Sequence, residues 1–242
     1  RLGWTRHEVE GLTLHGRAFS IFNAYVQPGA KLLILTDDGS TPAKIADALC
    51  VMGYGESRIT VFERMDSASE GIVQSTAADW RGAKTNDFNT VAVECIAGPD
   101  ASSRSRTPGL PDEVYANDGQ LTKREVRAIT LAALRPTPGE MLWDVGAGCG
   151  SVAIEWMRMH PRNEAVTIER NPDRVQMIAA NAEALGTPRL QIITGTAPTA
   201  FAESSAPDAI FIGGGLSDEG LIESSWTALR SGGRLVANVV TV

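Results

Sequence analysis

Histidine and cysteine are scarce in this chain, with three of each among 242 residues. The cysteines, Cys50, Cys95 and Cys149, are odd in number, lie far apart and stand in apolar or glycine-rich surroundings. This pattern argues against a disulfide framework and favours reduced thiols, as in a cytoplasmic protein. No cysteine or histidine stands at the spacing of a zinc site, so we expect no metal centre built from this chain.

The sequence also lacks a long apolar run and an excess of basic residues. No stretch approaches the roughly 20 apolar residues that cross a bilayer, and no signal-peptide pattern follows Arg1, so no membrane partner is expected. Because the first residue is not methionine, we expect the chain to begin inside a longer protein. The formal net charge of −7 argues against nonspecific nucleic-acid binding.

The first hundred residues have the pattern of an α/β domain without a phosphate-binding glycine loop. Three segments have the apolar character of strands: 31–37, 58–63 and 89–96. Apolar residues at helical spacing predict a helix that begins near Pro42 and ends at Gly53.

A linker is expected after this domain. The stretch from Gly98 to Pro111 is rich in Gly, Pro, Ser and Arg and has no apolar periodicity. We therefore predict a first domain at 1–100, a linker at 101–111 and a second domain at 112–242.

The second domain alternates predicted strands with predicted helices. The strands are expected at 141–145, 165–168, 190–194, 209–212 and 235–240. This alternation predicts a parallel sheet with helices on both faces, which binds ligands at the carboxyl ends of its strands. Five residues of interest fall at that edge: Asp144, Gly146, Glu169, Ala197 and Gly213. A Thr122-x-x-Glu125 capping box predicts the start of a helix before the first strand.

A glycine turn, from Gly146 to Gly150, follows the first of these strands. Its glycines stand at every second position, unlike the G-x-G-x-x-G spacing of dinucleotide sites, which argues against a pyrophosphate seated on the helix. Glu169 lies about where an acid grips ribose hydroxyls. Asp144 before the glycines and Glu169 beyond them suit a ligand with amino-acid and ribose parts. The alternative is a glycine turn that serves only the fold.

The pattern resembles motif I of class I S-adenosylmethionine-dependent methyltransferases, which implies a Rossmann-like fold and S-adenosylmethionine as the cofactor. By this resemblance the turn lies against the methionine part, Glu169 holds the ribose, and the segment after the third strand borders the adenine. The implied cofactor-binding residues are Thr122, Asp144, Gly146, Ala147, Gly148, Cys149, Gly150, Glu169, Gly195, Thr196 and Ala197.

The end of the fourth strand favours a carbon or otherwise activated acceptor. It reads Phe211-Ile212-Gly213-Gly214-Gly215, without the Asn/Asp-Pro-Pro-aromatic motif of methylases that act on planar nitrogens.

A more specific resemblance covers nearly the whole chain. GLPDEV (109–114), LTKREVR (121–127), LWDVGAGCGSVAIEW (142–156) and IGGG (212–215) resemble the methyltransferase-decarboxylases of cobalamin synthesis. The earlier segments LTLHGR, LTDDGSTP and VFER resemble the carboxyl half of a tetrapyrrole methylase domain. Fused in this order, they resemble the bifunctional family that methylates precorrin-6Y at C-5 and C-15. The glycine-rich half of a tetrapyrrole methylase is missing before Arg1, and the class I sheet stops after its fifth strand, so an internal fragment is expected.

The family resemblance implies a substrate and a reaction. It implies methylation of a small tetrapyrrole with loss of an acetate carboxylate, in cobalamin biosynthesis, by a homo-oligomer. The substrate carries many carboxylates, which basic residues would hold. The candidate substrate contacts are Lys123, Arg124, Arg127, Gly213 and Gly214. We assign no catalytic acid or base.

Two alternatives stay open at this point. One is a class I methyltransferase for RNA or protein, although acids outnumber bases in the second half of the chain. Tight, strongly salt-dependent binding of transfer RNA would favour it. The other is a non-catalytic nucleotide-binding module, which failure to bind S-adenosylmethionine would favour.

Overall fold

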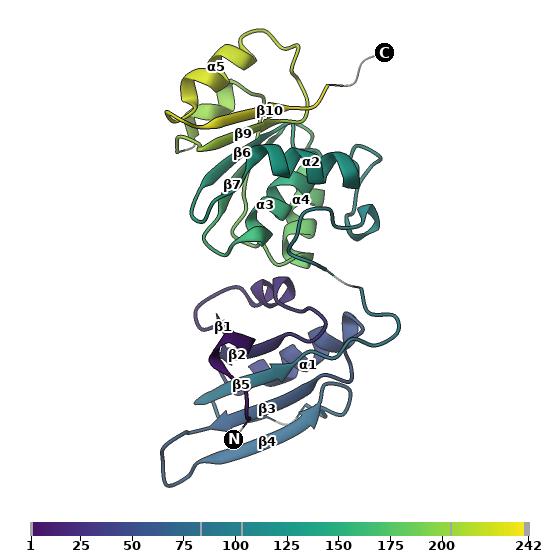
Figure 1. Ribbon diagram of the computed structural model, residues 1–242, viewed down its shortest axis with the longest axis vertical. Coiled ribbons are helices and arrows are strands. Elements are labelled where there is room, and N and C mark those ends of the chain that lie inside the picture. Colours follow the sequence, from purple (N-terminus) through teal and green to yellow (C-terminus); the bar gives the residue numbers. More distant parts are fainter. Residues whose placement is uncertain (1, 83, 103, 204, 240–242) are drawn as a thin grey trace. The chain divides into compact units, whose positions relative to one another are not determined.

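The computed structural model of the protein describes residues 2–82, 84–102, 104–203 and 205–239. The chain divides into two compact units, Arg1–Arg104 and Ser105–Val242 (Figure 1). The division falls within the segment 101–111, where the sequence predicts a linker. Each unit has its own sheet and its own hydrophobic core.

The first unit is built on a five-stranded mixed sheet with the strand order β1-β2-β5-β3-β4. Its strands are β1 (Val9–Thr13), β2 (Lys31–Leu35), β3 (Arg58–Glu63), β4 (Gly71–Thr76) and β5 (Asn89–Glu94). The pair β1–β2 is parallel and the other pairs are antiparallel. The sequence pattern missed β1 and β4 because these edge strands are only half-buried, so their apolar signal is weak.

The helix α1 (Thr41–Val51) supplies apolar side chains to the core of the first unit. Pro42 lies in its first turn, where a missing N–H costs no helical hydrogen bond. Ile45 and Leu49 are fully buried in that core. Beyond the helix, Gly53 has a φ of 83°, which turns the chain toward β3. Two short 3₁₀ helices complete the unit, η1 (Arg6–Glu8) and η2 (Phe19–Ala24).

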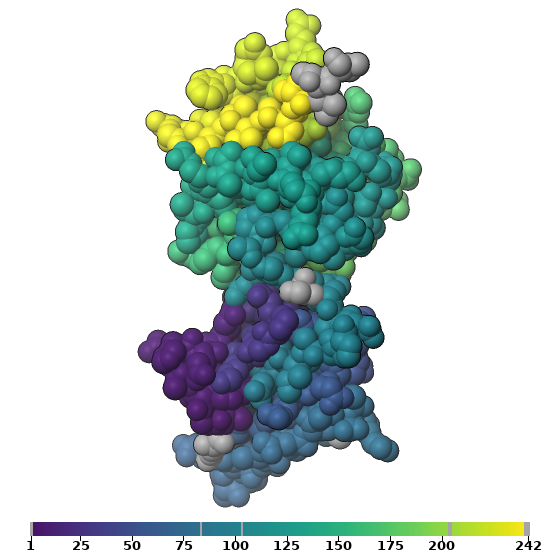
Figure 2. Space-filling model, turned by 45° about the vertical axis from the view of Figure 1, so that its right-hand side comes forward, coloured from purple at the N-terminus to yellow at the C-terminus, as the bar shows by residue number. Residues whose placement is uncertain are grey.

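The second unit contains a five-stranded sheet in which every pair is parallel, with the order β10-β9-β6-β7-β8. Its strands are β6 (Met141–Val145), β7 (Glu164–Glu169), β8 (Gln191–Thr194), β9 (Ala209–Ile212) and β10 (Arg234–Ala237). The chain runs outward from β6 to β8 and then returns to β9, so the topological switch point lies between β6 and β9. The edge strand β10, yellow in Figure 2, reaches the surface.

Helices cover both faces of this sheet. They are α2 (Arg124–Leu134), α3 (Ser151–Met159), α4 (Pro172–Ala184) and α5 (Leu221–Ala228), with short 3₁₀ helices η3 (Asp112–Val114) and η4 (Thr199–Glu203). Side chains alternate along β6: Leu142 packs in one core with α2, α3 and α4, and Trp143 packs in the other with α5. The predicted α/β fold with a Rossmann-like parallel sheet is therefore confirmed. None of the helices within the described ranges has the length and apolar character that a bilayer span requires.

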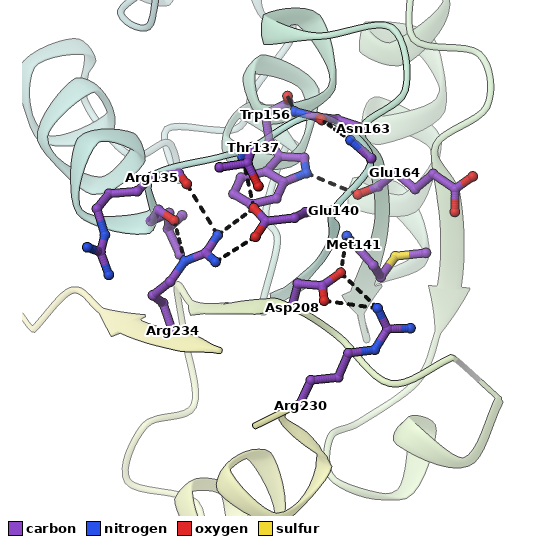
Figure 3. Close-up of polar contacts among 12 residues, drawn as sticks. Arg135, Thr137, Glu140, Met141, Trp156, Asn163, Glu164, Asp208, Arg230 and Arg234 are labelled. Atoms are coloured by element: carbon purple, nitrogen blue, oxygen red, sulfur yellow. Dashed lines mark hydrogen bonds and ion pairs between the residues drawn. The ribbon is translucent and has the colours of Figure 1, made fainter. Parts of the chain in front are cut away.

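Charged side chains fasten the amino ends of these strands (Figure 3). Arg234, which begins β10, donates to both carboxylate oxygens of Glu140 at 2.7 and 2.6 Å. Arg230 donates to Asp208 at 2.9 and 3.1 Å, and Asp208 also accepts the N–H of Met141. The hydrogen bond from Arg234 is the main reason why the pKa of Glu140 falls to about 2. These contacts lie at the amino ends of the strands, and a ligand is expected at the opposite, carboxyl ends.

The start of α2 differs from the prediction. The helix begins at Arg124 after Lys123, and no side chain caps it, so Thr122 is not the helix cap. The carbonyl of Thr122 instead accepts a hydrogen bond of 2.5 Å from the guanidinium of Arg127, which holds this residue outside the helix. The last strand is also shorter than predicted. The sequence predicts it at 235–240, but it ends at Ala237, and residue 240 lies outside the described residues.

Candidate functional site

The turn after β6 carries three glycines with left-handed backbone angles, with φ of 68° at Gly146, 59° at Gly148 and 78° at Gly150. Other residues adopt such angles only with strain. At Gly146 there is also no room for a side chain, because a Cβ would lie 2.8 Å from the backbone nitrogen of Gly214. The glycines therefore let the turns after β6 and β9 touch at the switch point of the sheet.

Glu169 ends β7 with its carboxylate bound to this turn. Oε2 accepts the N–H of Gly148 at 2.9 Å, and Oε1 accepts the N–H of Asn171 at 3.0 Å. Each carboxylate oxygen has two lone pairs, so each can accept one further hydrogen bond. The carboxylate is thus oriented by the backbone and still able to bind a pair of hydroxyl groups.

A pocket of about 460 Å³ opens along the carboxyl ends of β6, β7, β8 and β9. Its size is within the usual range for small-molecule sites. The glycine turn lies between two groups of lining residues. The β7 half consists of Ile168, Glu169, Arg170, Arg174, Gly195, Thr196 and Ala197. The β9 half consists of residues that lie at the end of β9, follow β9 and β10, or begin α2 and α5, and α2 contacts both of these strands: Lys123, Val126, Phe211, Gly213, Gly214, Gly215, Asp218, Leu221 and Asn238.

The segment before α2 is tied down across this turn. Asp118 pairs with Arg174 at 2.8 Å, and the backbone of Ala116 exchanges two hydrogen bonds with Asn181, at 2.8 and 2.9 Å. The carbonyl of Gln120 then lies so close that a Cβ on Gly148 would be 3.0 Å from it. This segment adds Gln120, Leu121 and Thr122 to the lining of the pocket.

Most residues predicted from the sequence line this one pocket. They are Thr122, Lys123, Gly146, Ala147, Gly148, Glu169, Gly195, Thr196, Ala197, Gly213 and Gly214. Their side chains and backbone come from five separate stretches, which the parallel topology gathers at one edge. Five other predicted residues do not line it: Asp144, Cys149, Gly150, Arg124 and Arg127.

Asp144 is buried behind the turn instead of facing the ligand space. The residue is 1% exposed, and Oδ2 accepts the N–H of Ala153 in the first turn of α3 at 3.1 Å. Oδ1 has no hydrogen-bond partner among the described residues. Burial raises the pKa of this carboxyl to about 7, with the charge of Glu169 as a smaller cause. Asp144 therefore fixes the start of α3 and does not contact a ligand directly.

Cys149 and Gly150 also serve the fold. The Cys149 side chain is buried in the core between the sheet and α3, and its carbonyl accepts a hydrogen bond from Asn181 at 3.0 Å. Burial is the main cause that raises the pKa of this thiol. Gly150 precedes α3, and a Cβ there would lie 2.9 Å from Ile178 of α4. Both residues pack the turn against neighbouring helices.

Arg127 is not a substrate contact, because its side chain is fully buried. Its Nε donates to Glu155 of α3 at 2.5 Å, and its Nη1 donates to Asp112 at 3.1 Å. Glu155 also accepts the backbone N–H groups of Gly109 and Leu110, at 2.6 and 3.0 Å. The pair thus fastens the end of the predicted linker to the second unit. A charge on an amphipathic helix looks the same in sequence whether it faces water or a buried acid.

Sequence reasoning missed several polar residues of the pocket: Gln120, Arg170, Arg174, Asp218 and Asn238. Arg170 directly follows Glu169, so its place at the strand end was available as a signal. Asn238 had no such signal, because it follows β10 at the far end of the domain sequence. In the part of the chain that the structure describes, no cluster of three or more His, Cys, Asp or Glu side chains could hold a metal ion.

The comparisons with known proteins agree with this geometry. Residues 113–242 match the family model of the precorrin methyltransferase domain. Over 241 residues the chain is 44% identical to a Sinorhizobium protein named precorrin-6Y C(5,15)-methyltransferase [decarboxylating], and it spans 58% of that protein. Over 139 residues it is 34% identical to a probable cobalt-precorrin-6B C(15)-methyltransferase (decarboxylating) from Sulfurisphaera tokodaii, with 56% of this chain and 72% of that protein covered.

A crystal structure is also similar. It is the C-terminal domain of precorrin-6Y C5,15-methyltransferase from Rhodobacter capsulatus, with a TM-score of 0.54 and 46% sequence identity. The match covers 57% of this chain and 74% of that one. Because the family model extends over more than half of the chain, these matches show that the chain belongs to the precorrin methyltransferase family.

Proposed function

We propose that the second unit binds S-adenosylmethionine in its pocket and positions the methyl group for transfer to a carbon of a precorrin macrocycle. The observation that supports this most directly is the hydrogen bond from Gly148 to Glu169. It joins a glycine-rich turn and an acid with unused lone pairs at the switch point, where α/β sheets bind nucleotide-like ligands.

The lining residues fit the parts of this cofactor. Glu169 has hydrogen-bonding capacity for the two ribose hydroxyls. The small residues from Gly195 to Ala197 leave room for a flat adenine in the β7 half. The backbone at Gly146 and Gly148 allows close approach of the methionine part, because neither residue has a Cβ.

S-adenosylmethionine supplies an electrophilic methyl group on a sulfonium, so the protein's part is orientation and exclusion of water. Contact between Gly146 and Gly214 sets the donor-binding turn directly beside the turn after β9. Residues Gly213, Gly214 and Gly215 carry no side chains there. A broad, rigid ring can therefore approach the methyl group from the β9 half. An electron-rich tetrapyrrole supplies its own carbon nucleophile, which removes the need for a strong protein base.

The names of the relatives suggest the acceptor. We assign to the complete protein the methylation of precorrin-6Y at C-5 and C-15, with loss of carbon dioxide from an acetate side chain. The Sulfurisphaera relative, named for C(15) methylation and decarboxylation, matches 56% of this chain, about the share of the second unit. We therefore place the C-15 methylation and the decarboxylation in the second unit. We assign the first unit to the carboxyl half of a tetrapyrrole methylase domain, as its sequence resemblance implies. Homo-oligomerisation stays a prediction.

Incubation of the protein with precorrin-6Y and S-adenosylmethionine, followed by mass spectrometry of the product, tests this proposal. The complete protein should add two methyl groups and remove one carbon dioxide, and this chain alone should add at least one methyl group with loss of carbon dioxide. An unchanged substrate mass, with cofactor binding intact, would contradict the proposal.

A further inference from the structure

The β9 half of the pocket contains an amide side chain that two elements hold in place. Asn238 follows β10, and its backbone N–H donates to the carbonyl of Ile212 at 3.3 Å, which sets it beside the end of β9. Its side chain contacts Thr130 of α2, whose Oγ1 lies 3.1 Å from Nδ2 and 3.3 Å from Oδ1. Thr130 is buried, with 2% exposed. The amide is therefore oriented in the wall of the pocket before any ligand binds.

This arrangement leaves a hydrogen-bond donor free. The amide nitrogen of Asn238 carries two N–H groups, and the single hydroxyl of Thr130 can engage at most one of them. Within the described residues, no other hydrogen bond involves Nδ2. At least one N–H is thus available to a ligand in the β9 half.

A loosely held cation lies in the same half. The Lys123 side chain is 67% exposed, and Asp112, its nearest acid, is 3.8 Å away. Asp112 makes a shorter contact of 3.1 Å with Arg127. It therefore competes only weakly with an incoming anion for Lys123. Asp218 is the acid among the lining residues of this half, and its exposure to solvent screens its charge.

We propose that Asn238 and Lys123 bind carboxylate groups of the acceptor in the β9 half of the pocket. An amide N–H and an ammonium group are both suitable donors to a carboxylate, because hydrogen bonds to an ionised acceptor are the stronger kind. This inference rests on the proposed function, in which the acceptor is a polycarboxylate macrocycle. It assigns substrate selection to Asn238 and Lys123, in place of Arg124 and Arg127.

Direct binding measurements test the assignment. The protein is loaded with S-adenosylhomocysteine and titrated with precorrin-6Y, and the absorbance of the macrocycle reports binding. Asn238→Asp replaces the donor by an acid of the same shape and should raise the Kd of the macrocycle by tenfold or more, as expected for a lost hydrogen bond to a charged group. Lys123→Gln should raise it severalfold and reduce its dependence on salt.

Matched controls separate this effect from general damage. Arg124→Gln removes the neighbouring exposed cation, which does not line the pocket, and should leave the Kd unchanged. The Kd of S-adenosylhomocysteine should stay the same in all three variants. Lys123 is mostly exposed, so its variant reports on the site even if Asn238→Asp folds poorly.

The outcomes distinguish this inference from the proposed function. An unchanged macrocycle Kd in Asn238→Asp and Lys123→Gln overturns the assignment, while turnover by the wild-type protein leaves the function standing. Binding without turnover in the wild-type protein overturns the function, and the variants still decide the assignment. Absence of macrocycle binding to the wild-type protein overturns both.

Discussion

The backbone N–H of Gly148 donates a hydrogen bond of 2.9 Å to Oε2 of Glu169. This bond links the turn after β6 to the end of β7, two segments that neighbouring parallel strands bring together. The acid holds the turn in position, and the turn orients the acid. Changes at either end should therefore disturb ligand binding more than they disturb the fold.

Glu169→Gln should weaken binding of S-adenosylhomocysteine by about 1.5–3 kcal/mol, roughly tenfold to a hundredfold in Kd. The amide keeps the shape of the side chain, but its one oxygen can accept from Gly148 or from Asn171 and not from both. It also loses the negative charge that strengthens hydrogen bonds from ribose hydroxyls. Isothermal titration calorimetry measures the Kd directly.

Glu164→Gln is the matched control for this experiment. Glu164 begins the same strand at the opposite edge of the sheet, and it is exposed (Figure 3). The control should leave the Kd unchanged. Equal affinities for the wild-type protein and Glu169→Gln would remove Glu169 from the cofactor site.

Gly146→Ala should lower both stability and cofactor affinity. Alanine at a φ of 68° costs about 1–2 kcal/mol, and its Cβ would also meet the backbone of Gly214 at 2.8 Å. Gly232→Ala, at a φ of 81° with nothing within 4 Å of the new Cβ, should show the angle cost alone. Thermal unfolding and S-adenosylhomocysteine titration should separate the two variants. Equal losses in both variants would mean that the turns after β6 and β9 do not touch.

Arg127→Met should destabilise the second unit by about 3–5 kcal/mol, because it leaves the buried carboxylate of Glu155 without its cation. Addition of Glu155→Gln should recover part of this loss by removing the stranded charge. Arg124→Gln, on the exposed side of the same helix, should change the free energy of unfolding by less than about 0.5 kcal/mol. Urea unfolding gives the free energy of unfolding of the wild-type protein, the two single variants and the double variant. Similar small effects of the Arg127 and Arg124 variants would show that Arg127 faces solvent.

The strands and the ligand edge of the second unit could be predicted because their signals are local. Residues 141–145 and 209–212 are fully buried, so an apolar run marks each strand, and both predicted ranges agree with β6 and β9. Glycines at alternate positions mark the turn because all three have a positive φ, and because only a residue without Cβ fits beside Gly214 at position 146. Parallel strand order then places Glu169 and Gly148 at the same edge.

What the sequence did not reveal depends on contacts between distant segments. Arg127 and Lys123 are both basic residues near the start of one helix, and only the position of Glu155 in α3 decides that Arg127 is buried. Asn238 reaches the pocket because β10 pairs with β9 and because Thr130 of α2 lies beside it. Neither contact leaves a periodic pattern, so neither could be read from spacing.

Asp144 gives the last prediction, which concerns pH. Burial raises its pKa from an ordinary value of 3.8 to about 7, so the folded protein keeps a proton that the unfolded chain releases. Between about pH 4 and pH 7 the free energy of unfolding should therefore fall as pH rises, by up to about 4 kcal/mol from this group. Above pH 7 both states are ionised, and the contribution levels off.

Asp144→Asn isolates this effect because an amide stays neutral throughout the range and can still accept the N–H of Ala153. Urea unfolding of both proteins between pH 4 and pH 8 gives the difference in unfolding free energy, variant minus wild type, at each pH. This difference should rise with pH and become constant above about pH 7. A difference that does not change with pH would mean that Asp144 ionises normally in the folded protein, and that its carboxylate reaches solvent or a partner.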